Sequence, residues 1–371
     1  MSELEKIIQS INKDSKYSLV NKGLRYIDTK KIPFSSMRMN YMTYGGIPRG
    51  HITEIAGEEN GGKTTLALDV VANAQRLFQK EWEDEIEALK GSDKASDKAR
   101  LGFLENTGCK KVVYLDAENT LDDAWMRTLG IETDKLLILS PQQESAEQLF
   151  EIIIKMLSTG EVGLLVIDSI GHLISQQAFD KTVEEKTYGG IALALTLFSK
   201  KASLLCSKYG TALIGINQLR DDLKSQYSAF TTTGGRGWKH TCSVRLLVSK
   251  GDFIDEMNQK IPKSRADAPA GNLVDVAVLK TKVFKPDRRR TVFTIKYDYG
   301  IDKIADVVEL GLQSEVITQK GAYFYFYDAD DKLMLYKERE LQFQGKAALI
   351  DFLRAEEEFT DEFAEHLIKL V

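Results

Sequence analysis

Cysteine, histidine and long apolar runs are scarce in this chain of 371 residues. The three cysteines (Cys109, Cys206 and Cys242) are far apart and odd in number, which argues against a disulfide framework and favours a reducing compartment. The four histidines are scattered, so no zinc-binding pattern is present. No apolar run approaches the ~20 residues that cross a bilayer, and the polar N-terminus lacks a signal-peptide core. We therefore expect a cytoplasmic protein without a membrane span.

A large excess of one charge is also missing. Fifty Lys and Arg residues against 55 Asp and Glu residues give a net charge of −5. Any binding to nucleic acid must therefore depend on a local basic patch. The hydrophobic share of 43% and the charged share of 28% are typical of a soluble globular protein, and the length allows one large core plus a small additional domain.

The first segment, Ser2–Asp14, predicts a short amphipathic helix. Its apolar residues recur at i, i+3, i+4 and i+7 from Leu4 to Ile11, and Ser2 and Glu5 form a capping box. A helix of this length is not stable alone, so it must pack either on its own domain or on a neighbouring subunit.

The centre of the chain alternates strand-like apolar runs with helical stretches, which predicts an α/β fold with a mainly parallel sheet between helices. Between the first two runs, the charged segment Glu81–Gly108 predicts an exposed insertion, either a partner-binding arm or a solvated helical excursion. From Ile301 to Val371 the pattern predicts a small α+β domain around an aromatic strand. The expected strands are His51–Ala56, Lys111–Asp116, Gly163–Asp168, Thr211–Asn217, Ser243–Ser249, Leu273–Val283 and Thr291–Tyr299.

The clearest chemical signal runs from Gly57 to Thr64, where the letters GEENGGKT fit the pattern G-x4-G-K-[ST] of a phosphate-binding loop. Its glycines allow backbone N–H groups to surround phosphate oxygens, and the following helix N-terminus adds a favourable dipole. The loop follows an expected strand at Ile52–Ala56 and precedes an apolar helix at Thr65–Leu77, the context that this motif requires. We therefore predict that Lys63 contacts the terminal phosphates and that Thr64 holds Mg²⁺.

Two further acids follow strand-like runs. Asp168 ends the apolar run from Leu164, at the sheet edge where such folds bind ligands, and would complete the Mg²⁺ site. Glu118 follows the strand that ends at Asp116. It is a candidate general base for water, but a carboxylate at this position is also typical of a helix cap.

These motifs together resemble the RecA recombinases of bacteria, including the phage UvsX type, from about Ile32 to the C-terminus. The resemblance implies a RecA-type P-loop ATPase core over 32–300, an N-terminal polymerisation arm and linker over 1–31, and a small C-terminal domain over 301–371. The residues that carry it, in family order, are Asp116-Ala117-Glu118, Asp122 to Gly130, Val166-Ile167-Asp168-Ser169, Ile216-Asn217-Gln218-Leu219-Arg220, Thr231-Thr232-Thr233-Gly234-Gly235 and Leu279-Lys280-Thr281-Lys282.

The resemblance also implies roles for single residues. Glu118 matches the catalytic glutamate, and Trp125 matches the aromatic residue that stacks on adenine. Gln218 matches the glutamine that senses the γ-phosphate and signals to the adjoining DNA loop. Lys280 and Lys282 match a pair that reaches the neighbouring subunit's ATP. The remaining contacts to ATP and Mg²⁺ are expected from Gly57, Glu58, Glu59, Asn60, Gly61, Gly62, Lys63, Thr64, Thr65 and Asp168.

Two loops, at about 179–190 and 218–236, correspond to the loops that contact DNA in the family. In the family, a second, weaker site for duplex DNA uses basic residues on a strand. Two of those positions are occupied by Asp275 and Ala277 in this chain. The nearest basic candidates, Arg288, Arg289 and Arg290, form either that site or a solvated hairpin tip. The expected contacts to single-stranded DNA are Lys201, Arg220, Thr231, Thr232, Thr233, Gly234, Gly235 and Lys239.

The implied function is that of a DNA-dependent ATPase that exchanges DNA strands. It would act as a helical homo-oligomeric filament on single-stranded DNA, with homologous duplex DNA, single-strand-binding proteins and loader proteins as partners. An acidic phosphate loop, the charged insertion and the lack of an acidic tail indicate a divergent member. A hexameric DNA motor and a recombination mediator that only binds remain as alternatives.

Overall fold

The computed structural model describes most of the chain beyond the N-terminal segment. The predicted helix at Ser2–Asp14, most of the loop at 179–190 and positions 222–229 of the second loop lie outside the described residues. The described ranges are 29–181, 190–221, 230–256, 258–262, 267–328, 330 and 332–370.

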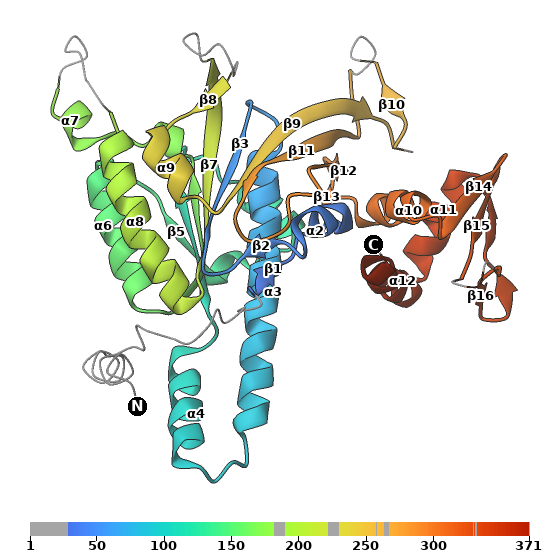
Figure 1. Ribbon diagram of the computed structural model, residues 1–371, viewed down its shortest axis with the longest axis horizontal. Coiled ribbons are helices and arrows are strands. Elements are labelled where there is room, and N and C mark those ends of the chain that lie inside the picture. Colours follow the sequence, from blue (N-terminus) through green and yellow to red (C-terminus); the bar gives the residue numbers. More distant parts are fainter. Residues whose placement is uncertain are drawn as a thin grey trace, which may run out of the picture. The chain divides into compact units, whose positions relative to one another are not determined.

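A sheet of eleven strands forms the centre of the fold (Figure 1). Its neighbours β9-β3-β7-β6-β4-β5 are paired in parallel, and β3 lies inside this array. The predicted parallel strands between helices are confirmed. Of the parallel strands in the described ranges, β5 was not predicted, because it is short and half exposed. The parallel strands are β3 (Ile52–Gly57), β4 (Lys111–Asp116), β5 (Leu136–Leu139), β6 (Val162–Asp168), β7 (Ala212–Asp221) and β9 (Val244–Ile254).

Antiparallel strands extend the sheet beyond β9. The order continues β9-β11-β12-β13, and two short strands pair outside this path, β8 with β7 and β10 with β9. β11 and β12 are antiparallel neighbours in this sheet, and residues 282–289 connect them without a crossover helix. The bounds are β8 (Phe230–Thr232), β10 (Lys260–Ile261), β11 (Gly271–Thr281), β12 (Arg290–Lys296) and β13 (Gly300–Ile301).

Helices cover both faces of the parallel strands. Along β4, Tyr114 belongs to the core on the side of α3, whereas Val113 and Leu115 belong to the core on the side of α6 and α8. This alternation follows from the two-residue period of a strand. The longer helices are α3 (Lys63–Leu89), α6 (Ala146–Ser158) and α8 (Ala192–Tyr209), and the short elements are β1 (Lys31–Ile32), α2 (Met37–Thr43), β2 (Ile47–Pro48), α5 (Asp123–Thr128), η1 (Thr133–Lys135), η2 (Ile170–His172), α7 (Gln176–Phe179) and α9 (Gly235–Thr241).

The charged segment 81–108 forms a helical hairpin (Figure 1). The second half of α3 carries the chain out, and α4 (Ala95–Thr107) brings it back. Trp82 Nε1 donates to the carbonyl oxygen of Leu104 at 3.0 Å, and Arg100 Nε contacts Glu85 Oε1 at 2.8 Å. Most other side chains of α4 are exposed, so few apolar contacts hold the pair together.

The residues after Ile301 build a further hydrophobic core, which includes Val308, Phe326 and Phe363 and is joined by Met37 of α2. A three-stranded antiparallel sheet, β14-β15-β18, contributes one face of this core. No helix in the described ranges is both long and apolar enough to span a membrane. The elements are α10 (Lys303–Gln313), β14 (Ile317–Lys320), β15 (Tyr323–Phe326), β16 (Leu335–Tyr336), β17 (Arg339–Glu340), β18 (Gln342–Gln344), α11 (Lys346–Ala355) and α12 (Glu357–Leu370).

Candidate nucleotide site and DNA loop

The loop between β3 and α3 has the form of a phosphate cradle. A β-carbon on Gly57 would lie 2.1 Å from the carbonyl oxygen of Val248, so only glycine fits beside β9. Gly62, the N-cap of α3, has a φ of 93°, which also favours glycine. The unpaired N–H groups at the start of α3 thus follow a tight loop, an arrangement that binds anions.

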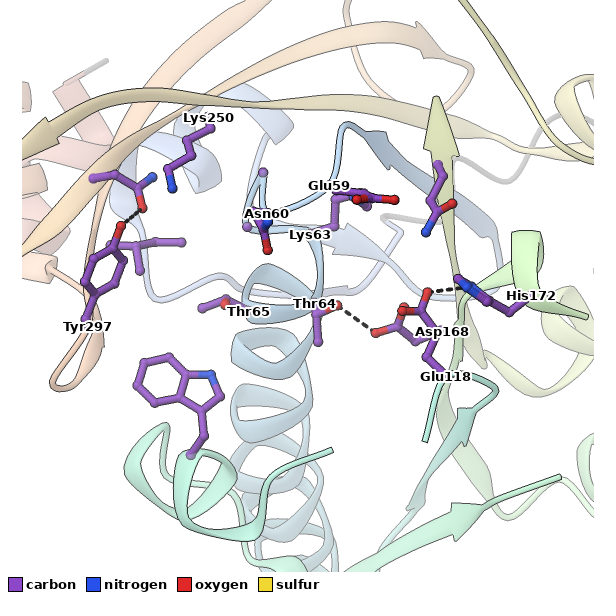
Figure 2. Close-up of a pocket in the computed structure, with 16 residues that line it drawn as sticks. Glu59, Asn60, Lys63, Thr64, Thr65, Glu118, Asp168, His172, Lys250 and Tyr297 are labelled. Atoms are coloured by element: carbon purple, nitrogen blue, oxygen red, sulfur yellow. Dashed lines mark hydrogen bonds and ion pairs between the residues drawn. The ribbon is translucent and has the colours of Figure 1, made fainter. Parts of the chain in front are cut away.

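A cavity of about 570 Å³ opens above this loop (Figure 2). Glu118, Asp168 and His172 gather at one end, and Lys250 and Tyr297 lie at the other. The loop residues lie between these ends, so the cavity offers a polar, charged end and an aromatic end. The lining residues are Glu59, Asn60, Gly61, Gly62, Lys63, Thr64, Thr65, Glu118, Trp125, Asp168, His172, Gln218, Lys250, Asn272, Ile295 and Tyr297.

Lys63 is a cation that the fold buries: only 8% of the residue is exposed. Its Nζ donates to the carbonyl oxygen of Glu58 at 2.5 Å. Burial lowers the pKa of the Lys63 ammonium, and the negative charges of Asp168 and Glu118 offset part of that effect. An anionic ligand in the cavity would compensate the cost of burying this charge, which is what a phosphate does.

Thr64 and Asp168 meet where β6 ends against the start of α3. Thr64 Oγ1 donates to Asp168 Oδ2 at 2.8 Å, and the buried Tyr114 hydroxyl donates to the same oxygen at 2.6 Å. Burial raises the pKa of the Asp168 carboxyl, and both hydrogen bonds oppose that shift. Hydroxyl and carboxylate oxygens are ligands suited to Mg²⁺, which takes its others from water and phosphate. The residues present therefore fit a magnesium ion.

Glu118 is not a helix cap. The N-cap of α5 is Asp122, whose carboxylate accepts from the Trp125 backbone N–H at 2.6 Å. The Glu118 side chain lines the cavity instead, with Oε1 2.8 Å from Nδ1 of His172. The structure thus excludes the helix cap for α5 and places Glu118 at the cavity; its role as general base stays a prediction.

The aromatic end of the cavity combines residues from three elements. Trp125 comes from α5, Asn272 from β11, and Tyr297 follows β12. The Tyr297 hydroxyl donates to Asn272 Oδ1 at 3.0 Å. An aromatic side chain and an amide can contact a base, and only Trp125 was predicted. Asn272 and Tyr297 carry no local signal, because the pairing of β11 with β12 brings them together.

Gln218 connects the cavity to the predicted DNA loop. It lines the cavity on β7, and the strand continues so that Arg220 pairs with Thr231 of β8. Lys239 Nζ donates to Thr231 Oγ1 at 2.6 Å. After β8, Gly234 caps α9 with a φ of 101°. Of the predicted loop residues, Thr231 and Thr232 thus lie in β8, paired with the strand that lines the cavity, and Thr233, Gly234 and Gly235 follow directly.

The family model of the RecA N-terminal domain matches residues 2–88 and 103–302 of the chain. The chain belongs to the RecA family. Among its curated relatives, Protein RecA of Acidothermus cellulolyticus is 31% identical over 338 residues, which cover 91% of this chain and 82% of the relative. Protein RecA of Deinococcus radiodurans is 29% identical over 374 residues, covering 100% and 87%. A crystal structure of the RadB recombinase is 18% identical with a TM-score of 0.46, covering 71% of this chain and 95% of that one.

The match to the RecA N-terminal domain is interrupted at 89–102. This gap coincides with the tip of the α3–α4 hairpin, from the end of α3 to the first half of α4. The family model therefore does not cover the hairpin tip, and that this segment is an insertion stays a prediction. That this hairpin binds a partner, one of the two alternatives from the sequence, stays a prediction.

The lysine pair predicted to act across subunits lies away from this RecA chain's own cavity lining. Lys280 Nζ donates to the carbonyl oxygens of Lys239 at 2.6 Å and His240 at 3.0 Å, and Lys282 Nζ donates to that of His240 at 2.8 Å. Burial, followed by the charge of Lys282, lowers the pKa of Lys280. Both ammonium groups thus lie at the C-terminal end of α9, just beyond the predicted DNA loop.

Lys201 and two of the predicted duplex-binding arginines, Arg288 and Arg290, contact other residues of the RecA core. Lys201, in the middle of α8, pairs with Glu151 of α6 at 3.2 Å. Arg290 pairs with Asp275 of β11 at 2.6 Å.

Arg288 lies with its guanidinium carbon 3.7 Å from the ring centre of Tyr41, and Arg289 is exposed. Arg290 keeps 72% of its side chain exposed, and the role of the three arginines in binding duplex DNA stays a prediction.

Proposed function

We propose that this RecA-family chain is a DNA-dependent ATPase that exchanges DNA strands as a filament on single-stranded DNA. The observation that carries the proposal is the cavity itself. It combines a phosphate loop, the oxygen ligands of Thr64 and Asp168 that suit Mg²⁺, and Glu118, which does not cap α5. Strand β7 extends from the cavity into the predicted DNA loop. A mediator that only binds would not require this set of groups.

ATP bound with Mg²⁺ would supply the phosphoryl group and neutralise part of its charge. Thr64 and Asp168 are the residues that would hold the ion, and Lys63 would contact the terminal phosphates. Glu118 would accept the proton of the attacking water as general base. Trp125 would stack on the base at the aromatic end. Charged side chains at one end of the cavity and aromatic side chains at the other fit a nucleoside triphosphate.

Gln218 supports coupling between hydrolysis and DNA. It lies on the same strand as Arg220, so a shift of β7 moves an amide in the cavity together with the start of the loop. The loop residues after β8 are glycines and threonines, whose N–H and hydroxyl groups suit sequence-independent contacts to the DNA backbone. DNA bound to the loop would thus affect the bound nucleotide through Gln218.

The sheet edge at β5 supports assembly into a filament. β5 ends the strand order, so no strand in the described part of the chain pairs with its outer side, and Leu137 and Ile138 are 46% and 44% exposed. An exposed apolar edge strand is a template for another chain. We propose that it meets a neighbouring subunit, with the N-terminal segment Ser2–Asp14 as the polymerisation arm.

The test is an ATPase assay with and without single-stranded DNA, followed by strand exchange with a homologous duplex. We expect hydrolysis that DNA stimulates, joint molecules in the exchange assay, and helical filaments by electron microscopy with an ATP analogue. Closed rings would instead identify a hexameric motor. DNA binding without hydrolysis would identify a mediator and contradict the proposal.

The lysine pair gives a separate prediction. If Lys280 and Lys282 stabilise charge on the neighbour's γ-phosphate, as an arginine finger does, hydrolysis requires assembly. A Lys280→Ala, Lys282→Ala variant and a Glu118→Gln variant should each be inactive alone. Mixed filaments should recover part of the activity, because some interfaces pair an intact cavity with intact lysines. Filaments shown to be mixed but still inactive would place the lysines' action within their own subunit.

A further inference from the structure

The turn η2 presents a histidine to the proposed general base. His172 Nδ1 lies 2.8 Å from Glu118 Oε1 and 2.9 Å from the hydroxyl oxygen of Ser169. Figure 2 shows the imidazole and the Glu118 carboxylate facing each other at the polar end of the cavity. His172 is not among the predicted site residues, and it belongs neither to the phosphate loop nor to the acids at the strand ends.

The hydrogen-bond chemistry of this contact fixes the orientation of the carboxylate. An ionised carboxylate only accepts hydrogen bonds, so a nitrogen 2.8 Å from Glu118 must carry a hydrogen. Nδ1 is therefore the donor whenever Glu118 is ionised and able to act as a base. Glu118 lies in the connection between β4 and α5, outside both elements, where its side chain needs a partner to stay in one rotamer.

The turn that carries His172 is itself packed. A β-carbon on Gly171 would lie 3.9 Å from both Gln218 Oε1 and Thr233 Oγ1, which is ordinary contact distance. The Ser169 hydroxyl oxygen lies 2.9 Å from the same Nδ1, and Ile170 is fully buried in the core beside α8. The imidazole thus comes from a turn that is anchored in the core and lies beside the cavity glutamine and Thr233.

We propose that His172 is a positioning residue, which holds the Glu118 carboxylate in the orientation needed to accept the proton from water. This inference rests on the proposed function. His172 does not take part in the proton transfer itself: the proton moves from water to Glu118, and Nδ1–H remains a donor to the carboxylate. Loss of the donor should therefore slow the chemical step without weakening nucleotide binding.

Three variants separate this role from simple packing. His172→Ala should lower the kcat of DNA-stimulated hydrolysis by about 10-fold to 100-fold, the scale of a misplaced catalytic group, with KM for ATP unchanged. Asn and Leu have nearly the same shape, but only Asn offers an N–H close to the position of Nδ1. His172→Asn should therefore recover much of the rate, whereas His172→Leu should not. Thermal unfolding of each variant shows that the fold is intact.

A double-mutant cycle adds a readout that a structural role would not move. In a Glu118→Gln background, His172→Ala should cause no further loss in single-turnover hydrolysis, because the base it positions is gone. An unchanged kcat in His172→Ala, equal rates for Asn and Leu, or losses that multiply in the double variant would each overturn the inference. These outcomes in an active parent chain leave the proposed function standing, whereas a parent without DNA-stimulated hydrolysis overturns the proposed function and this inference with it.

Discussion

Glu118→Gln is expected to slow DNA-stimulated ATP hydrolysis by at least ~10²-fold, the usual scale of a lost general base. Glutamine keeps the size and the acceptor oxygen of the side chain, so the cavity should still bind nucleotide and the loop should still bind DNA. An amide cannot take a proton from water at neutral pH, and only the chemical step is lost. Steady-state hydrolysis and equilibrium binding of a fluorescent ATP analogue measure the two effects separately.

Two further variants frame this result. Lys63→Ala should lose nucleotide affinity as well as turnover, because it removes the buried cation that we propose contacts the terminal phosphates. Glu161→Gln is the matched control: this exposed acid precedes β6, and β6 runs its full length before reaching Asp168. Near-parental turnover in Glu118→Gln would remove Glu118 from the site.

The polar end of the cavity was predictable because its parts follow a rule of sheet geometry. Parallel strands end at one edge, so the phosphate loop after β3, Glu118 after β4 and Asp168 at the end of β6 must meet there once the strands are recognised. The order β3-β7-β6-β4 then places the strand of Gln218 between those of the loop and Asp168. These predictions needed only strand ends, which hydrophobic runs indicate well.

The residues that were missed depend on contacts that no local pattern encodes. In the sequence Tyr114 does not differ from any other apolar strand residue. Its hydrogen bond to Asp168 exists only because β4 pairs with β6. His172 gains meaning only because η2 turns towards Glu118. The ion pair of Arg290 also depends on pairing that the sequence does not show. The register of β11 and β12 sets Arg290 opposite Ala277, one diagonal step from Asp275, and its role in binding duplex DNA stays a prediction.

A second network that the sequence does not reveal lies under the phosphate loop. Glu54 of β3 has no exposed surface, and its carboxylate accepts from Asn217 Nδ2 at 3.0 Å and from Trp238 Nε1 at 2.9 Å. Arg245 of β9 forms an ion pair with the same carboxylate through Nε and also approaches Thr232 Oγ1 at 3.4 Å. One buried acid thus joins β3, β7, β9 and the base of the DNA loop.

Arg245→Met is expected to cost about 3–5 kcal/mol of the free energy of unfolding, because it leaves the Glu54 charge buried without its cation. Methionine keeps the apolar stem of arginine, so little packing is lost. Adding Glu54→Gln should recover much of the stability, since the amide oxygen still accepts from Asn217 and Trp238 while the buried charge disappears. Urea unfolding of the nucleotide-free protein measures each variant. Arg290→Met removes an exposed partner of Asp275 and is the matched control, with an expected loss below about 1 kcal/mol. Equal losses for Arg245→Met and Arg290→Met would mean that the Glu54 network does not stabilise the core.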